Sequence, residues 1–163
     1  MRACIRHGGA GILMAVLAAL ALPGSATAQA QDQAAVMAVV HTLFDGMREK
    51  DSTKLASVWH REARLQSTGR DEQGNPTVTT LDVAAFSQRI VSMKPTVDEE
   101  TFDEQVMVNE DLAMVWAPYN VFVDGEFRHC GVDAFQLVRT ADGWKILQLA
   151  DTETQKGCDP SRR

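Results

Sequence analysis

Apolar residues recur at helical spacing in the first part of the chain beyond residue 30. Over residues 31–50 they follow the i, i+3, i+4, i+7 rule, which predicts an amphipathic helix with a broad buried face. Asp51 or Ser52 can then cap a second, shorter helix that includes Trp59 and ends near residues 61–63. The chain is therefore expected to place two helices before its first strand.

A short hairpin and a third helix are expected next. Residues 63–68 alternate between apolar and polar as a strand does, and a turn-forming stretch leads from them into the β-branched segment 77–80. A third helix begins at Thr80 or Asp82, and Pro95 ends it because proline cannot donate a backbone hydrogen bond.

The hydrophobic period changes from helical to alternating after Pro95. Four strand-like runs follow, joined by hairpin sequences such as Asp124-Gly125. The runs comprise residues 102–108, 112–123, 127–139 and 144–150. Helices followed by such a meander predict an α+β domain, in which a curved antiparallel sheet wraps around the helices.

The start of the chain has the pattern of a secretory signal. Arg2 and Arg6 precede an apolar run at 11–22, and Ala26-Thr27-Ala28 presents the small residues of a cleavage site. The run is shorter than the roughly 20 residues of a membrane-spanning helix, so no membrane span is expected. We expect an exported protein, periplasmic or extracellular. The expected division is a signal peptide at 1–28, a domain at 29–152 and a polar tail at 153–163.

Charge and cysteine content narrow the choice further. The 16 basic residues against 22 acidic ones give a net charge of −6, which argues against a surface that binds nucleic acid. Cleavage of the signal would remove Cys4 and leave Cys130 and Cys158 in an oxidising compartment. We therefore expect a disulfide between these two residues.

Three local segments resemble a known superfamily. They are residues 56–63 (ASVWHREA), 133–139 (DAFQLVR) and 142–146 (DGWKI). With the order of elements, they resemble the nuclear transport factor 2-like superfamily, the cone-shaped fold of ketosteroid isomerase, scytalone dehydratase and polyketide cyclases, and in particular its lumazine-binding-like exported bacterial group. The resemblance covers about residues 31–152. It implies the cone fold more strongly than a function, because this fold hosts enzymes and non-catalytic binders.

Strand parity predicts a pocket face on the sheet. A two-residue turn at Asp124-Gly125 pairs Trp116 with Asp133, and Asn120 with His129. Their face is otherwise large and apolar, so we expect the helices to cover it, and polar groups on an apolar wall favour a small-molecule pocket. The predicted pocket residues are Trp59, Met114, Trp116, Asn120 and Phe135.

Asp133 with His60 or His129 is the candidate acid–base pair. Burial raises the pKa of a carboxyl group, and a histidine exchanges protons near neutral pH. Each has a structural alternative: Asp133 as a backbone hydrogen-bond partner, His60 as a favourable charge at a helix end, and His129 as a solvated residue. In the predicted register Tyr119 faces away from the pocket, so a phenol donor is missing. A metal site of these three residues lacks close ligand spacing, and we expect no cofactor.

Two hypotheses for function follow. The first is an exported small-molecule-binding or accessory protein, whose cone holds a small apolar or aromatic ligand or helps to form a homodimer through the sheet. The second is a cofactor-independent lyase or isomerase that uses Asp133 and a histidine. We prefer the first because the sequence contains no complete catalytic set.

Overall fold

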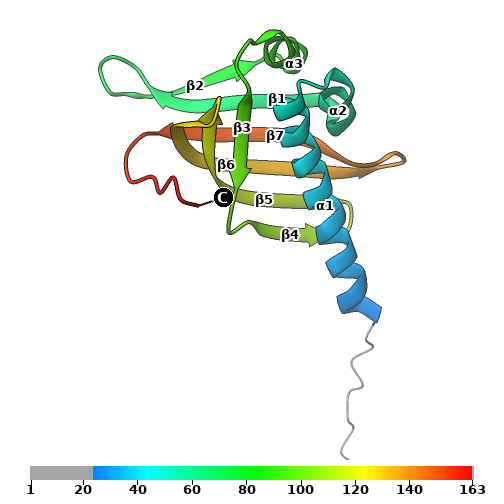
Figure 1. Ribbon diagram of the computed structural model, residues 1–163. Coiled ribbons are helices and arrows are strands. Elements are labelled where there is room, and N and C mark those ends of the chain that lie inside the picture. The colour runs from blue at the N-terminus through cyan, green and yellow to red at the C-terminus, as the bar shows by residue number, and fades with distance from the viewer. Residues whose placement is uncertain (1–23, 163) are drawn as a thin grey trace, which may run out of the picture.

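The computed structural model describes residues 24–162 and has three helices and a curved seven-stranded sheet (Figure 1). The helices are α1 (Gly24–Glu49), α2 (Ser52–Val58) and α3 (Val83–Ser92). The strands are β1 (Trp59–Arg70), β2 (Pro76–Leu81), β3 (Val97–Thr101), β4 (Gln105–Asn109), β5 (Leu112–Val123), β6 (Glu126–Thr140) and β7 (Gly143–Thr154). The predicted α+β class, with a curved sheet around helices, is confirmed.

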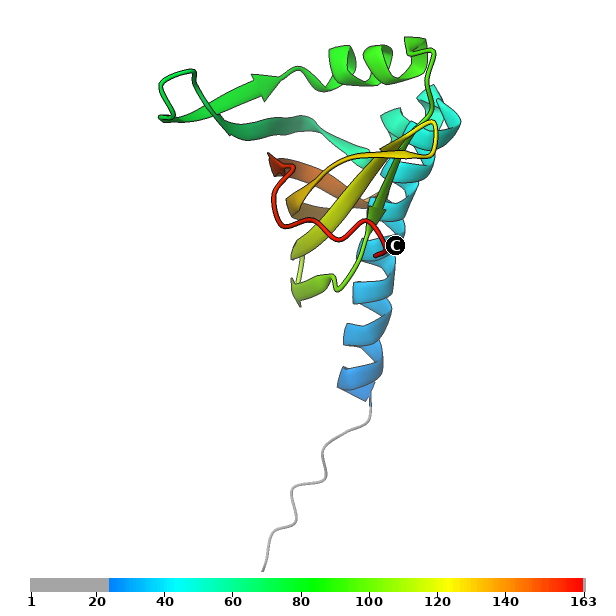
Figure 2. The same ribbon diagram turned by 60° about the vertical axis from the view of Figure 1, so that its left-hand side comes forward.

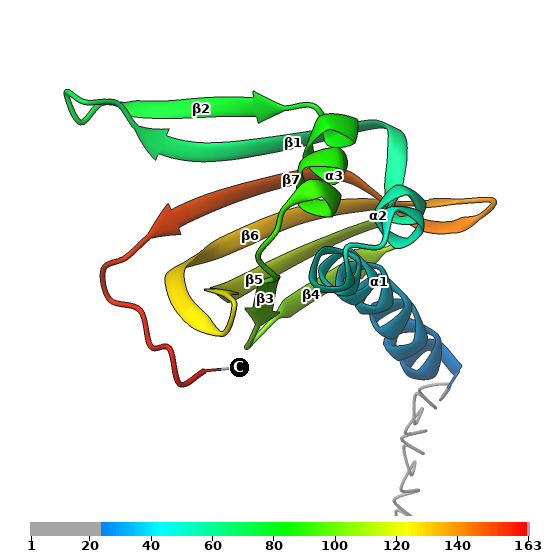
Figure 3. The same ribbon diagram turned by 45° about the horizontal axis from the view of Figure 1, so that its top comes forward.

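The strand order is β2-β1-β7-β6-β5-β3, and β4 also pairs with β5. All neighbours are antiparallel except β1 and β7, which run parallel. The sheet is strongly curved; α1 crosses its concave face, and α2 and α3 lie beside β1 (Figures 2 and 3). The four-stranded meander expected from the sequence is therefore present as β4 to β7.

Side-chain caps define where two of the helices begin. The Asp51 carboxylate accepts hydrogen bonds from the backbone N–H groups of Thr53 and Lys54, at 2.8 and 3.1 Å. The Asp82 carboxylate accepts from the Ala85 N–H at 2.8 Å. Each such cap stabilises a helix by about 1 kcal/mol. Both caps agree with the residues proposed from the sequence.

Two element boundaries differ from the prediction. The second helix ends at Val58, and β1 begins at Trp59, so His60 lies in a strand and not at a helix end. The expected strand at 102–108 is found as β4, which begins only at Gln105, and an unpredicted strand, β3, precedes it beyond a bend at which Asp103 has a φ of 52°. The strand β3 was missed because its sequence, VDEET, is mostly acidic and has little β propensity.

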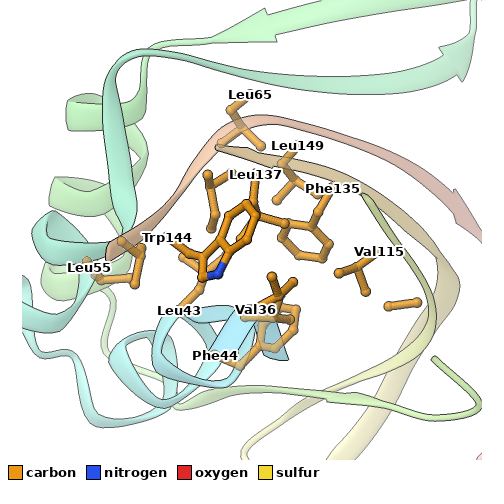
Figure 4. Packing of buried hydrophobic residues seen from close by; sticks show 14 of the residues in the cluster. Val36, Leu43, Phe44, Leu55, Leu65, Val115, Phe135, Leu137, Trp144 and Leu149 are labelled. Atoms are coloured by element: carbon orange, nitrogen blue, oxygen red, sulfur yellow. The ribbon is translucent and has the colours of Figure 1, made fainter. Parts of the chain in front are cut away.

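The core fills the space between α1 and the concave face. Figure 4 shows side chains of α1, such as Phe44, directed towards Phe135 of β6 and Val115 of β5. The rings of Phe44 and Phe135 meet edge to face, with their centroids 6.2 Å apart. Burying each such large apolar side chain stabilises the fold by about 1.5–3 kcal/mol. The cone is therefore packed where α1 crosses it.

A β-bulge between β5 and β6 changes the predicted pairing. The Asp124-Gly125 turn has positive φ at both residues, as a type I′ turn requires, and Phe122 lies opposite Phe127 as expected. The next pair is Val121 with His129, so β6 contains one extra residue at this point. Every pair further along the strands is displaced by one position.

The displaced register reverses the predicted faces of β5 but not those of β6. Ala117, and not Trp116, lies opposite Asp133. Trp116 and Met114 point outward and are 50% and 42% exposed, so their assignment to the pocket is wrong. Tyr119 points inward and is buried. The inward residues of β5 before Tyr119, which are Ala113, Val115 and Ala117, are small, and this lets α1 approach the sheet closely.

The C-terminal segment runs along the outward face of the sheet, and a disulfide holds it there. Cys130 and Cys158 are bonded, with their Cα atoms 5.8 Å apart, as expected from the sequence. Asn120 is fully buried beneath this segment, and its Nδ2 donates to the carbonyl oxygens of Asp159 and Arg162 at 2.9 and 2.8 Å. Asn120 is therefore a structural clamp on the outward face, and its predicted place in the pocket is wrong.

The N-terminal expectations fall largely outside the described residues. Of the expected signal peptide at 1–28, residues 1–23 are not described, and residues 24–28 form the start of α1. Within residues 24–162, no helix is both long enough and apolar enough to cross a membrane.

Candidate functional site

Three carboxyl groups gather on the concave face beyond the packed part of the cone. Asp133 on β6 lies directly opposite Asp151 on β7, and both point inward. Glu99 reaches the same place from β3, where its partner is the inward residue Val121. Asp133 is only 2% exposed. The inward parity of three different strands thus assembles this carboxyl cluster, Glu99, Asp133 and Asp151.

Burial is the main cause of the raised pKa values in the carboxyl cluster. It raises the pKa of Glu99 to about 7 and raises that of Asp133 well above its ordinary value. A hydrogen bond between the two side chains lowers the pKa of Glu99 and raises that of Asp133. Asp133 therefore keeps its proton and is the donor of this hydrogen bond, and Glu99 is the acceptor. Burial also raises the pKa of Asp151. The cluster therefore retains protons at a pH at which exposed carboxyls are ionised.

No lysine or arginine between residues 24 and 162 forms an ion pair with the carboxyl cluster. The positive influence on Asp151 is His129, which lowers the pKa of this carboxyl group but does not outweigh the effect of its burial. His129 Nδ1 lies 3.8 Å from the Glu153 carboxylate at the open end of the cluster. Of the two candidate histidines, His129 therefore lies beside the acidic group.

Tyr119 forms one wall of the carboxyl cluster. Its hydroxyl donates to the carbonyl oxygen of Thr152 at 2.8 Å, and its ring meets the His129 ring edge to face at 5.8 Å between centroids. Burial and the neighbouring carboxyls raise the pKa of Tyr119, so the phenol stays protonated. The expectation that Tyr119 faces away from the site is wrong, because the bulge turned this strand over.

A separate hollow of about 790 Å³ lies between α2, β1, the end of β2 and the start of α3. Trp59 and His60 line it, together with apolar side chains from α2, both strands and α3. Those apolar residues are Ala56, Ala63, Leu81, Val83 and Ala84. This β1–α3 hollow has the size of a ligand pocket, which is roughly 300–1,000 Å³ in proteins.

The predicted site residues are thus divided among different places. Asp133 and His129 lie at the carboxyl cluster, whereas His60 and Trp59 line the β1–α3 hollow. Phe135 is fully buried in the core. Sequence reasoning missed three groups of the cluster, Glu99, Asp151 and Tyr119.

The structure does not favour a metal site at these residues. Within residues 24–162, no group of three or more histidine, cysteine, aspartate or glutamate side chains has the arrangement to hold a metal ion. Of the residues considered for an acid–base pair or a metal site, His60 lies in the β1–α3 hollow, whereas Asp133 lies in the carboxyl cluster.

Solved structures with this fold come from several bacteria. A nuclear transport factor 2-like protein with a cystatin-like fold from Novosphingobium aromaticivorans is 14% identical, with a TM-score of 0.66 over 88% of this chain and 94% of that chain. A protein of unknown function from Mycobacterium tuberculosis is 14% identical, with a TM-score of 0.66 over 85% of this chain and 80% of that chain. A protein from Streptomyces avermitilis described as a "putative dehydratase" is 16% identical, with a TM-score of 0.61 over 77% and 97%. Likeness at such identities shows the fold alone.

No curated protein matches the chain. A family model described as "Putative lumazine-binding" matches residues 31–149, which include most of α1, the whole of α2 and α3, and most of the sheet. The family model and the solved structures agree on the fold. The chain belongs to this "Putative lumazine-binding" family, and it has the fold of the solved nuclear transport factor 2-like proteins.

Proposed function

We propose that the protein binds a small, largely apolar molecule in the β1–α3 hollow. The observation that carries this proposal is the hollow itself, at about 790 Å³, with an apolar surface supplied by β1, β2 and α3. The core under α1 is filled by side chains, so a ligand of this size does not fit there without repacking. The family description, which names lumazine binding, agrees with a ligand of bicyclic size.

The residues around the hollow suit a flat apolar molecule. Trp59 and Leu81 offer apolar surface on its two strands, and Leu81 is 38% exposed although it is a large hydrophobic residue. Ser87 and Gln88 of α3 line the same space and can fix a ligand's orientation by hydrogen bonds. An apolar wall with a few polar groups is the usual composition of a small-molecule site.

Binding of a neutral bicyclic probe, 2-naphthalenemethanol, tests the proposal. In ¹H–¹⁵N spectra we expect saturable shifts that centre on Ala63, Leu81 and Val83. Ala63→Trp fills the hollow and should abolish these shifts, whereas Ala85→Trp, on the exposed part of α3, should leave them unchanged. Shifts that survive Ala63→Trp, or no binding at all, would contradict the proposal.

A second candidate is a cofactor-independent isomerase or lyase. It is supported by the proton that Asp133 retains beside Glu99, together with the inward phenol of Tyr119. A protonated carboxyl donates to a developing oxyanion, and its conjugate base accepts a proton from carbon. The Tyr119 hydroxyl already donates to Thr152, so it would have to change partner in such a reaction.

Proton exchange at carbon tests this alternative directly. An enzyme of this class should catalyse deuterium incorporation from heavy water into the methyl group of acetophenone, followed by NMR. Asp133→Asn should abolish the exchange, while His60→Gln should leave it unchanged because His60 lies in the β1–α3 hollow and not at the carboxyl cluster. Exchange at the same rate in Asp133→Asn would exclude Asp133 as the acid–base group.

We also propose a homodimer through the outward face of the sheet. Met107 of β4 and Leu112, Met114 and Trp116 of β5 are exposed there, and adjacent strands bring Met107 opposite Met114. None of these side chains is charged, in a chain of net charge −6. In a two-fold dimer this patch packs against the same patch of the second subunit. A face without charges therefore avoids the repulsion that would arise between two acidic surfaces.

Export to the periplasm or the exterior is proposed from two features. The Cys130–Cys158 disulfide is of the kind that persists in an oxidising compartment. The start of the chain has the charge and hydropathy pattern of a secretory signal. Fractionation of a bacterial host that expresses the protein tests this proposal. We expect the protein in the periplasmic or culture fraction, and recovery from the reducing cytoplasm alone would contradict export.

A further inference from the structure

The charge of the β1–α3 hollow is opposite to that of the chain. His60, Arg61 and Arg64 line it, against one carboxylate, Asp82. That carboxylate is already engaged, because it accepts the Ala85 N–H at the start of α3. The chain as a whole has a net charge of −6. The hollow is therefore a local basic site on an acidic protein.

Arg64 is available to a ligand. Elsewhere in the described chain, Arg48, Arg139 and Arg162 form ion pairs with aspartates. Arg64 has no such pair within residues 24–162. A guanidinium group presents parallel N–H donors that fit the two oxygens of a carboxylate.

Arg61, which also lines the hollow, is held only by a weak ion pair. Its guanidinium lies 3.6 Å from the Glu62 carboxylate, and the two side chains are 85% and 69% exposed. Pairs this exposed contribute little, because water and salt screen them. A ligand carboxylate that is partly shielded by the wall of the hollow can therefore attract Arg61 as well.

The hydrogen bonding of His60 adds a donor. Its Nδ1 accepts the backbone N–H of Glu62 at 3.2 Å. In the neutral imidazole the proton must then be on Nε2, which is left to donate to another group. His60 therefore adds a donor to the guanidinium groups of Arg61 and Arg64, which line the same hollow.

The adjacent apolar residues determine the remainder of the ligand. Ala63, Leu81 and Val83 line the hollow beside the basic group, so the part of a ligand that they contact must be apolar. We propose that the ligand of the β1–α3 hollow is an apolar or aromatic carboxylate, with its charged end held by Arg64 and His60 and its apolar body against β1, β2 and α3. This inference rests on the proposed function and specifies the chemical class of its ligand.

A matched pair of probes separates the two claims. We expect 2-naphthoate to bind the protein at least about tenfold more tightly than the neutral 2-naphthalenemethanol, because charge-assisted hydrogen bonds exceed neutral ones. The measurement is isothermal titration calorimetry at pH 7.5, at low and at physiological salt. The advantage of the naphthoate should shrink as salt screens the charge.

Variants locate the charge effect in the hollow. Arg64→Gln should weaken the binding of 2-naphthoate by about tenfold and leave that of 2-naphthalenemethanol unchanged. Arg89→Gln makes the same charge change on an exposed part of α3 outside the hollow, and should have little effect on either probe. Circular dichroism verifies that each variant is folded.

Each outcome has a distinct meaning. Equal affinities for the two probes, or equal effects of Arg64→Gln and Arg89→Gln on the naphthoate, overturn the carboxylate class while the proposed binding function stands. No binding of either probe overturns both. Selective loss of naphthoate affinity in Arg64→Gln supports both.

Discussion

Asp133 on β6 and Asp151 on β7 lie directly opposite each other on the concave face. Two ionised carboxylates at such positions repel each other, and here Glu99 adds a third negative group. The fold tolerates this arrangement because Asp133 keeps its proton and donates a hydrogen bond to Glu99. The stability of the protein therefore depends on the protonation of this cluster.

We expect the free energy of unfolding to fall as the pH rises from about 4.5 to about 7. The folded-state pKa values of Glu99 and Asp133 are raised, so in this window the folded state binds more protons than the unfolded state, and raising the pH favours unfolding. Each linked proton contributes a slope of up to about 1.4 kcal/mol per pH unit. Urea denaturation across this range measures the slope.

Asp133→Asn serves as the test variant for this pH dependence. An amide can donate to Glu99 without carrying a charge, so the slope should become flatter and the stability at pH 7.5 should equal or exceed that of the unaltered protein. Glu126→Gln, an exposed acid at the start of β6, is the control and should keep the original slope. An unchanged slope in Asp133→Asn would show that the cluster does not hold the proton.

The faces of β5 could not be read from the sequence, although its bounds could. The strand was predicted at 112–123 and is found at Leu112–Val123, because alternating apolar residues and hairpin turns are local signals. The bulge opposite Val121 depends on how two strands twist together, which no local pattern specifies. One extra residue was enough to exchange Trp116 for Ala117 opposite Asp133, because side chains alternate between faces.

The candidate site was only partly predictable for a related reason. Asp133 and His129 were found because a polar residue stood out on an apolar strand. Glu99 was missed because its strand is mostly acidic, so that Glu99 does not stand out from its neighbours, although its pairing with β5 places it inward. Trp59 was predicted in the same pocket as Asp133, and His60 as a possible acid–base partner of Asp133, whereas the structure places both in the β1–α3 hollow, which Asp133 does not line.

Gly131→Ala should be among the most damaging single substitutions. A Cβ atom at this position would lie 1.9 Å from the Thr152 carbonyl oxygen and 2.8 Å from the Tyr119 hydroxyl oxygen, so strands β6 and β7 would have to separate. We expect a loss of at least about 3 kcal/mol in unfolding free energy, or no folding. Gly69→Ala, where the nearest contact is 3.4 Å, is the matched control and should change stability by less than about 1 kcal/mol.

Cys158→Ser should destabilise the protein by roughly 3.5 kcal/mol in the chain-entropy treatment, because the disulfide links residues 28 positions apart. The C-terminal segment should also be less protected from hydrogen exchange, because the hydrogen bonds from the Asn120 side-chain amide to the carbonyl oxygens of Asp159 and Arg162 would then hold it without the disulfide. Hydrogen exchange of the C-terminal segment measures the second effect. Equal stability of Cys158→Ser and the oxidised protein would mean that the segment is held without the bond.

Trp116→Lys should shift the protein from dimer to monomer without unfolding it. Trp116 is 50% exposed on the outward face, so the change removes apolar surface and places a charge at the proposed contact while leaving the core intact. Sedimentation equilibrium measures the change. Val78→Lys makes a comparable change at an exposed residue of β2 and should leave the dimer intact. A monomeric unaltered protein would rule out the outward-face dimer.

The mature protein should begin at or near Gln29, and the packing of α1 explains why cleavage there is harmless. Residues 26–30 are exposed, and beyond them α1 is anchored by an ion pair from Asp32 to Arg139 at 2.8 Å and by the Gln33 side chain, which donates to the Val106 carbonyl at 3.0 Å. A chain starting at Gln29 keeps both anchors, so its melting temperature should match that of a longer chain, whereas one starting at Ala35 should melt at a lower temperature. Mass spectrometry of the exported protein identifies its first residue, and an exported chain that still starts at Met1 would contradict the signal peptide.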